Sequence, residues 1–208
     1  VLIDKSGSNT KVNPDFLPTK TVLDLYDQTN DLRFAAYFKK GSMNFSSGSP
    51  QLYYCSKYPG NPLYCTGNTQ FINAPKILRI AEMYLILAEA YKESNDETNA
   101  LSYLNALRSK RIAGYTDQTY SGTALTNEIR KERQRELYME GYRLWDLKRY
   151  GIGLSGRTPQ DGTYVYQNGG ANSTEISKEA SDFRFVWPIP THEINANPQM
   201  KDQQNEGY

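Results

Sequence analysis

Apolar side chains recur with helical spacing between residues 76 and 93, and this is the clearest pattern in the chain. Apolar or small residues follow the i, i+3, i+4, i+7 spacing of an amphipathic helix, at Ile77, Ile80, Ala81, Tyr84, Leu87, Ala88 and Tyr91. Pro75 suits the first turn of such a helix, and the polar residues 94–98 end it. The pattern therefore predicts a helix over roughly residues 76–93.

A second helix follows after a short polar break, with Asn95 or Asp96 as its cap and an end near Gly114. Its inner face carries Ala100, Leu101, Leu104 and Leu107. The short break predicts an antiparallel hairpin, and small residues facing large ones are typical of a tetratricopeptide-like unit. One hairpin cannot bury its faces alone. Residues 125–150 supply at least one more helix pair, divided near Gly141.

The rest of the chain is less regular. Asn13-Pro14 marks an irregular lead-in over residues 1–17, and residues 39–75 are rich in glycine, proline and serine. Five further segments have distinct predictions: a short helix at 19–27, an extended piece at 31–38, a surface excursion at 151–182, a short strand or extended segment at 183–190, and one helical turn capped by Thr191 at 191–197.

Composition and charge exclude several classes of protein. The 208 residues carry 24 basic and 23 acidic side chains, a net charge of +1, which gives no electrostatic reason to expect nucleic acid or an anionic membrane as partner. No apolar run approaches the roughly 18–20 residues that cross a bilayer. Cys55 and Cys65 leave open either a disulfide or free thiols. Two cysteines and one histidine do not make an ordinary zinc site.

A row of glutamates is the most conspicuous candidate for chemistry. Glu132, Glu136 and Glu140 recur every four residues and so share one helix face. Paired carboxylates perform glycoside hydrolysis when they oppose each other across a cleft, and di-iron sites use Glu-x-x-His pairs. Interleaved arginines instead keep these carboxylates ionised. We therefore expect a partly buried ion-pair lattice that joins helices, with no metal site.

Other catalytic arrangements find little support. The sequence has no G-x-S-x-G motif and no phosphate-binding loop. Its one histidine, His192, lies beside prolines and is expected at the surface. We predict that the protein is not an enzyme and has no cofactor. The sequence leaves open a structural calcium held by loop Asp and Asn oxygens.

Four stretches, taken in order, resemble the C-terminal half of the SusD/RagB family. "RIAEMYLILAEAY" resembles the family's arginine-then-AEA helix, and "ERQRELYMEGYRLWDLKRYG" its ER-x-x-EL-x-x-EG-x-R-x-x-DL-x-R block. "WPIPTHEINANP" is similar to its PIP-x-x-E-I-x-x-NP segment, and "QNEGY" to its closing Q-N-P-G-Y, with Glu206 in place of proline. The resemblance extends from about Asp31 to Tyr208.

This resemblance implies a mainly α fold of the α/α superhelix type. In it, tetratricopeptide-like helical hairpins pack against an irregular, loop-rich region. It implies one SusD-like region over residues 1–208. That region has a lead-in and ligand-side segment (1–75), helical hairpins (76–151) and an excursion with a C-terminal framework segment (152–208). Family members are longer, so we expect a lipid anchor and the first helical repeats to lie outside this chain. The family acts on the cell surface at the Gram-negative outer membrane and partners a SusC-like TonB-dependent transporter.

Aromatic loops are then the expected ligand surface. Sugar rings stack their C–H faces on aromatic rings, and the segment before the AEA helix corresponds to the family's aromatic arc. The candidate ligand-binding residues there are Phe45, Tyr53, Tyr54 and Tyr64, with Asn44 and Asn61 and, beside them, Lys57. Tyr58 is expected to belong to the framework, Trp145 and Trp187 to the core, and Tyr164 and Tyr166 to a second, weaker candidate site.

Two functions follow from this interpretation. The first is a surface protein that captures an oligosaccharide or another nutrient and delivers it to the transporter. The alternative is a tetratricopeptide-type scaffold for protein segments, or a binder of a peptide nutrient. Exposed aromatic residues gathered in the loops would favour nutrient binding. Exposed aromatic residues gathered on the helical hairpins would favour the scaffold. The first predicts that Tyr53→Ala or Tyr54→Ala weakens ligand binding without lowering stability.

Overall fold

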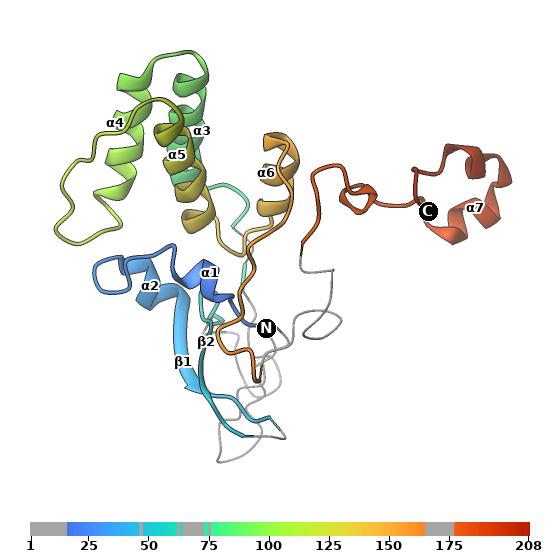
Figure 1. The fold of residues 1–208 in the computed structure, drawn as a ribbon, viewed down its shortest axis with the longest axis horizontal. Helices are drawn as coiled ribbons and strands as arrows, with labels where there is room; N and C mark the ends of the chain where they lie inside the picture. The colour runs from blue at the N-terminus through green and yellow to red at the C-terminus, as the bar shows by residue number, and fades with distance from the viewer. Residues whose placement is uncertain (1–15, 46–47, 62, 64–72, 75, 165–176) are drawn as a thin grey trace.

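The computed structural model describes residues 16–45, 48–61, 63, 73–74, 76–164 and 177–208. Figure 1 shows a group of helices above a two-stranded hairpin, and a C-terminal arm that extends to one side. Several residues singled out in the sequence lie outside the described residues, namely Asn13, Pro14, Tyr64, Cys65, Pro75 and Tyr166. No helix in the described ranges combines the length and the apolar character that a membrane crossing requires.

Helices form the upper part of the molecule (Figure 1), as the sequence predicts. They are α3 (Ile80–Glu93), α4 (Glu97–Arg108), α5 (Gly122–Glu136) and α6 (Arg143–Tyr150). Asp96 caps α4 by accepting a hydrogen bond from the Asn99 N–H at 3.1 Å. The α3–α4 pair is the expected antiparallel hairpin, and α5 packs against both of its helices. The predicted mainly α architecture is confirmed.

Small and large side chains interlock where these helices meet. The central cluster contains Ala88, Ala100, Leu104, Leu125 and Ile129. The expected inner face of α3 is partly wrong, since Leu85 is fully buried while Leu87 is 37% exposed and Ile80 74% exposed. The helix begins at Ile80, so Ile77 precedes it. Both sides of α3 are apolar, and periodicity alone does not choose between them.

A turn separates α5 from α6, at the position predicted from Gly141. Gly141 has φ of +86° and Met139 has φ of +59°. Both values lie in the left-handed region, which glycine adopts freely and other residues adopt at a cost. The chain therefore reverses within residues 137–142.

The lower part begins with α1 (Lys20–Leu23), capped by Thr19, and α2 (Leu32–Tyr37), capped by Asp31. The prediction of an extended segment at 31–38 is wrong for α2. Its aromatic side chains pack into a cluster of Leu23, Tyr26, Phe34 and Phe38. Two antiparallel strands follow, β1 (Phe38–Ser42) and β2 (Gln51–Cys55), within a region expected to be loop.

Residues 152–164 run down to the lower part, where Gln160 contacts β2, and residues 177–208 form the arm (Figure 1). Its elements are η3 (Phe183–Phe185), α7 (Thr191–Ala196) and η4 (Pro198–Gln203). The segment expected as a strand therefore begins with a 3-10 turn, and Pro190 rather than Thr191 occupies the cap position of α7. Gln204 holds the arm together through both backbone groups of Ile189, at 2.8 and 3.0 Å.

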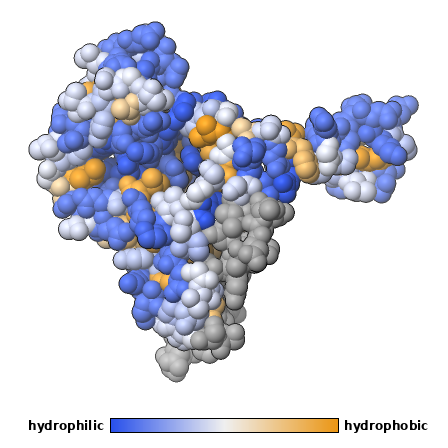
Figure 2. Space-filling view, in the orientation of Figure 1, coloured by the Kyte–Doolittle hydropathy of each residue, from blue (hydrophilic) through white to orange (hydrophobic). Residues whose placement is uncertain are grey.

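Both tryptophans are exposed, so their assignment to the core is wrong. Trp145 on α6 is 64% exposed and Trp187 in the arm is 80% exposed. Figure 2 shows a largely hydrophilic surface interrupted by apolar patches, one of them near the base of the arm. Both tryptophans lie inside motifs of the family resemblance. Such a motif does not determine which side of a helix or segment faces the core.

Candidate functional site

Glu132 is the centre of the acidic row and is closed off from solvent. Its carboxylate contacts Arg33 at 2.6 Å, Arg108 at 2.9 Å and Arg135 at 2.6 Å, and its side chain is 0% exposed. Burial alone would raise the pKa of Glu132, but the charges of these arginines lower it. A carboxylate held ionised by three guanidinium groups does not act as a general acid.

Glu136 is held in a similar way. It contacts Arg33 at 3.0 Å, Arg79 at 2.8 Å and Arg111 at 2.9 Å. Burial would raise the pKa of Glu136, yet hydrogen bonds from Arg111 and Arg79 and the charge of Arg33 lower it to about 2. The predicted ion-pair lattice is confirmed, and it joins α2, α5 and the residue before α3.

Lys57 belongs to the same lattice rather than to a ligand surface. Its ammonium group donates to the carbonyls of Glu136 at 3.1 Å and Tyr138 at 2.8 Å and pairs with Glu140 at 2.5 Å. The side chain is 5% exposed, and burial lowers the pKa of its ammonium group. The expectation that Lys57 neighbours a ligand is therefore wrong. Tyr58 next to it donates to the Met139 carbonyl at 3.3 Å, in keeping with a framework role.

The two strands of the hairpin decide which candidate residues share a surface. Lys39 pairs with Tyr54 and Lys40 with Tyr53. Residues directly opposite each other lie on the same face of a sheet, whereas neighbours along a strand point to opposite faces. Tyr53 and Tyr54 therefore point away from each other and do not form one platform.

Tyr53 lies on the face that packs toward α2. Its ring meets Phe34 edge to face, with centroids 5.3 Å apart, and Lys40 Nζ lies 5.4 Å from the ring centroid. Its backbone N–H and carbonyl both bond the Gln160 side chain at 2.8 Å. Tyr53 is thus largely a structural residue.

Tyr54 lies on the other face together with two more aromatic residues. Tyr54 and Phe45 pack against the buried pair Met43 and Leu52, and Phe45 meets Tyr164 with ring centroids 5.6 Å apart. All three aromatic residues are half-buried, so each keeps part of its surface in contact with solvent. We call Phe45, Tyr54 and Tyr164 the aromatic ledge.

Glycine allows Tyr54 to lie close to the backbone. A Cβ added at Gly41 would come within 3.3 Å of the Tyr54 ring, so the ring lies across the neighbouring strand at this position. This contact supports one face of the ring, and the Tyr54 side chain as a whole is half-buried. The ledge is therefore fixed by the hairpin before any ligand arrives.

The remaining candidates have local roles. Asn44, which precedes Phe45, is exposed and accepts a hydrogen bond from Ser49 Oγ at 3.1 Å. Asn61 accepts one from the Leu63 N–H at 3.0 Å and so closes a turn. Cys55 is a buried free thiol, and burial raises its pKa. The structure thus brings Phe45 and Tyr54 together with Tyr164, which the sequence indicated only as a weaker site.

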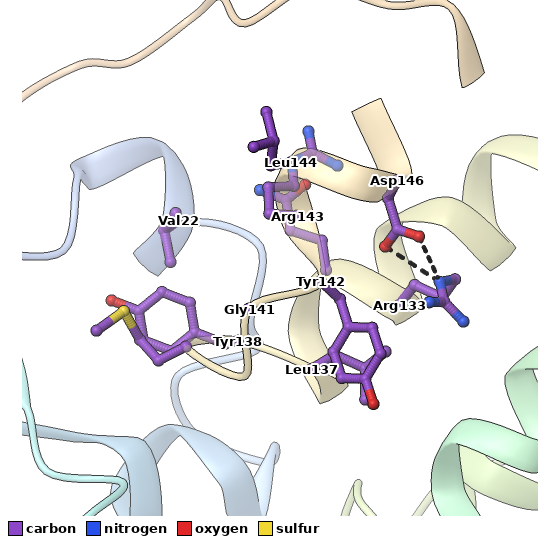
Figure 3. Close-up of a pocket in the computed structure, with 11 residues that line it drawn as sticks. Val22, Arg133, Leu137, Tyr138, Gly141, Tyr142, Arg143, Leu144 and Asp146 are labelled. Carbon is purple, nitrogen blue, oxygen red and sulfur yellow. Dashed lines mark hydrogen bonds and ion pairs between the residues drawn. The ribbon is translucent and has the colours of Figure 1, made fainter. Parts of the chain in front are cut away.

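A cavity of about 340 Å³ lies elsewhere, between α1 and the α5–α6 turn (Figure 3). Its walls include Val22, Leu137 and Tyr138, and Figure 3 shows the Arg133–Asp146 ion pair, 3.1 Å long, at its side. None of the described residues that line it is among the predicted ligand contacts. The cavity is a feature of the helical framework and not of the aromatic ledge.

Comparison with known proteins places the chain in a family. Residues 15–208 match the SusD family. The chain belongs to the SusD family. The predicted resemblance is therefore confirmed over nearly the whole chain.

Among curated SusD relatives, the SusD-like protein P25 of Formosa agariphila is 31% identical over 137 residues, which cover 64% of this chain and 24% of that protein. The starch-binding protein SusD of Bacteroides thetaiotaomicron is 31% identical over 135 residues, covering 64% of this chain and 21% of that protein. The matches thus span about a quarter of each relative or less.

Solved structures of other proteins share the fold. A SusD superfamily protein from Bacteroides thetaiotaomicron aligns with a TM-score of 0.66 and 29% identity, over 90% of this chain and 40% of that one. A putative sugar-binding protein from Bacteroides vulgatus aligns with a TM-score of 0.61 and 25% identity, over 91% of this chain and 39% of that one.

Two residues near the ledge were missed by sequence reasoning. Lys39 lies directly opposite Tyr54, and Gln160 ties a distant segment to β2. Finding Lys39 requires the strand register, which an interpretation of residues 39–75 as loop does not provide. Gln160 gives no local signal, because its partners are 107 and 142 positions away.

Proposed function

We propose that this protein binds carbohydrate at the cell surface, where it captures an oligosaccharide and delivers it to a TonB-dependent outer-membrane transporter. The observation that carries the proposal is the aromatic ledge, a set of partly exposed rings on and beside a hairpin in a SusD-family chain. The starch-binding relative supports carbohydrate as the ligand class.

Binding would rest on stacking and hydrogen bonding. An apolar C–H face of a sugar ring fits against an exposed aromatic ring, and the amide of Asn44 beside Phe45 offers a partner for sugar hydroxyls. The aromatic rings need only be exposed and held in place. No bond cleavage is proposed, because the acidic row is enclosed by arginines.

The location and the transporter partner are also part of the proposal. SusD-family membership supports an outer-membrane lipoprotein. In that arrangement the protein would cover the transporter barrel and pass on its ligand through binding and hinge motion.

Titration against a panel of oligosaccharides tests the proposal. With a glycan that binds, Tyr54→Ala should weaken affinity by about tenfold, the effect typical of a central aromatic contact. Trp145→Ala is a matched control, because Trp145 is an exposed aromatic residue outside the ledge. Failure of every oligosaccharide with a folded protein, or equal losses in both variants, would contradict the proposal.

A second candidate function is the docking of a protein or peptide segment on the helices. The outward face of α3 is apolar and exposed at Ile80, Met83, Ile86 and Leu87, and a groove of about 430 Å³ separates Ile86 from Arg149 of α6. A helix that is apolar all round is normally covered on both sides. If docking is the main function, Ile86→Ser should abolish binding of an amphipathic peptide probe, and Tyr54→Ala should leave it unchanged.

A further inference from the structure

Lys39 lies beside the ledge, and no ion pair holds it among the described residues. It is exposed and stands directly opposite Tyr54 across the hairpin. Directly opposite residues have Cβ atoms about 4.5–5.5 Å apart, so the side chains of Lys39 and Tyr54 leave the hairpin on the same face. Within the part of the chain that the structure describes, no carboxylate forms an ion pair with Lys39.

The stretch of sequence that contains the hairpin has basic residues and no acidic ones. Residues 32–81 contain no Asp or Glu, and their basic residues are Arg33, Lys39, Lys40, Lys57, Lys76 and Arg79. Three of these, Arg33, Lys57 and Arg79, are paired with glutamates of the ion-pair lattice. The neighbouring segment 152–164 adds one arginine and one aspartate, which balance. The hairpin therefore carries uncompensated positive charge in a chain whose net charge is only +1.

We propose that the Tyr54 face of the hairpin selects an acidic glycan, and that Lys39 is the residue that determines this preference. The inference rests on the proposed function, since it names the substrate class of the same ledge. A sugar ring stacks on Tyr54, and a carboxylate or sulfate group on that sugar meets the Lys39 ammonium group. Uronic acids and sulfated sugars present the same chemistry at this point.

Lys40 provides an internal control. It is the next residue along β1 and is also exposed, but it points to the opposite face, where its ammonium group lies 5.4 Å from the Tyr53 centroid. Replacing either lysine with glutamine removes one charge from the same strand. Only the change at Lys39 alters the charge beside the ledge.

The test is calorimetric titration with two pairs of oligosaccharides. Oligogalacturonate and its methyl ester form the uronate arm, and sulfated galactan oligosaccharides and their desulfated form are the sulfate arm. We expect an acidic member to bind roughly two- to fivefold more tightly than its neutral counterpart, the size of an exposed ion pair. Lys39→Gln should weaken that binding roughly two- to fivefold, as for an exposed ion pair, and reduce its dependence on salt. Lys40→Gln should leave both unchanged.

The outcomes separate this inference from the proposed function. If a neutral oligosaccharide binds as tightly as its acidic counterpart, loses affinity in Tyr54→Ala and is unaffected by Lys39→Gln, the acidic preference is wrong and carbohydrate binding stands. Equal effects of Lys39→Gln and Lys40→Gln also overturn the role of Lys39. If none of the four binds, and neutral glucans and xylans fail as well, both the inference and the proposed function are contradicted.

Discussion

Arg33 Nη1 lies 2.6 Å from Glu132 Oε1, although 99 positions separate the two residues. The side chains are 3% and 0% exposed, so this ion pair is formed away from water. It joins α2, at the root of the hairpin, to α5 in the helical layer. The acidic row therefore connects the helices to the part of the molecule that bears the ledge.

Glu132→Gln should destabilise the protein strongly. The substitution leaves Arg33, Arg108 and Arg135 facing a neutral amide in a buried site, and breaking a buried ion pair in this way costs roughly 3–5 kcal/mol. The free energy of unfolding, measured by urea titration, checks this. Lys20→Gln is the control: it breaks the Lys20–Asp24 pair, whose members are more than half exposed, and should change stability by less than about 1 kcal/mol. Similar losses in the two variants would show that the row is not a framework.

Stability should fall as the pH drops from about 4.5 towards 2. The pKa of Glu136 is about 2 in the folded protein, against 4.5 for an ordinary glutamate. A group with a depressed folded-state pKa contributes its stabilisation above the unfolded-state pKa, and this contribution is lost as the pH falls through that window. The difference corresponds to roughly 3 kcal/mol. Urea midpoints at pH 7, 5, 4 and 3 measure the loss.

The variant Arg111→Met checks whether Glu136 is the residue that causes the loss of stability at low pH. Arg111 contacts Glu136 at 2.9 Å, and its side chain is 28% exposed, so the variant should still fold. Removing this cation raises the folded-state pKa of Glu136. The decline in stability should therefore have its midpoint at a higher pH than in the wild type. An unchanged pH profile would argue that Glu136 does not dominate the acid response.

Tyr53→Ala should lower stability as well as any binding. The Tyr53 ring packs against Phe34 in the aromatic cluster of the lower part, and truncating a half-buried aromatic residue should cost about 2 kcal/mol, less than the 3–5 kcal/mol typical of a fully buried one. From the sequence alone, Tyr53→Ala is expected to weaken ligand binding without lowering stability. The packing against Phe34 changes that expectation. Thermal unfolding of Tyr53→Ala and Lys40→Gln side by side measures the effect. If Tyr53→Ala is as stable as the wild type, the Tyr53 ring does not stabilise the aromatic cluster and this prediction is contradicted.

Gln160→Ala should make strand β2, which carries Tyr54 of the ledge, less stable. The Gln160 side chain bonds both backbone groups of Tyr53 at 2.8 Å and the Pro18 carbonyl at 2.8 Å. Losing these bonds should cost about 1–3 kcal/mol, because they satisfy partly buried backbone groups. Hydrogen exchange at residues 51–55 should become faster, while exchange in α4 should not change. Equal exchange rates at residues 51–55 in both proteins would show that the hairpin holds its shape without this link.

The helical layer was largely predictable from the sequence. Asp96 and the break at Gly141 are local signals for a cap and a turn, and both features occur in the structure. The alternation of arginine and glutamate also predicted the ion-pair lattice. These features depend on neighbours within a few positions along the chain.

The rest depends on contacts between distant residues. The stretch that forms α2 contains aromatic residues typical of strands. It is nevertheless a helix, because Asp31 caps its first turn and Arg33 forms an ion pair with the distant Glu132. Tyr53 and Tyr54 looked equivalent, and only the strand register separates their faces. Trp145 is exposed because its side of α6 is not the side that carries the buried Asp146 and Leu147.

Hydrogen–deuterium exchange with and without a bound oligosaccharide tests the central claim most directly, namely that the hairpin meets the ligand and the ionic helix supports it. We expect ligand to slow exchange in residues 39–45 and 52–54 and to leave residues 128–140 unchanged. Protection confined to residues 128–140, with the hairpin unaffected, would contradict this account.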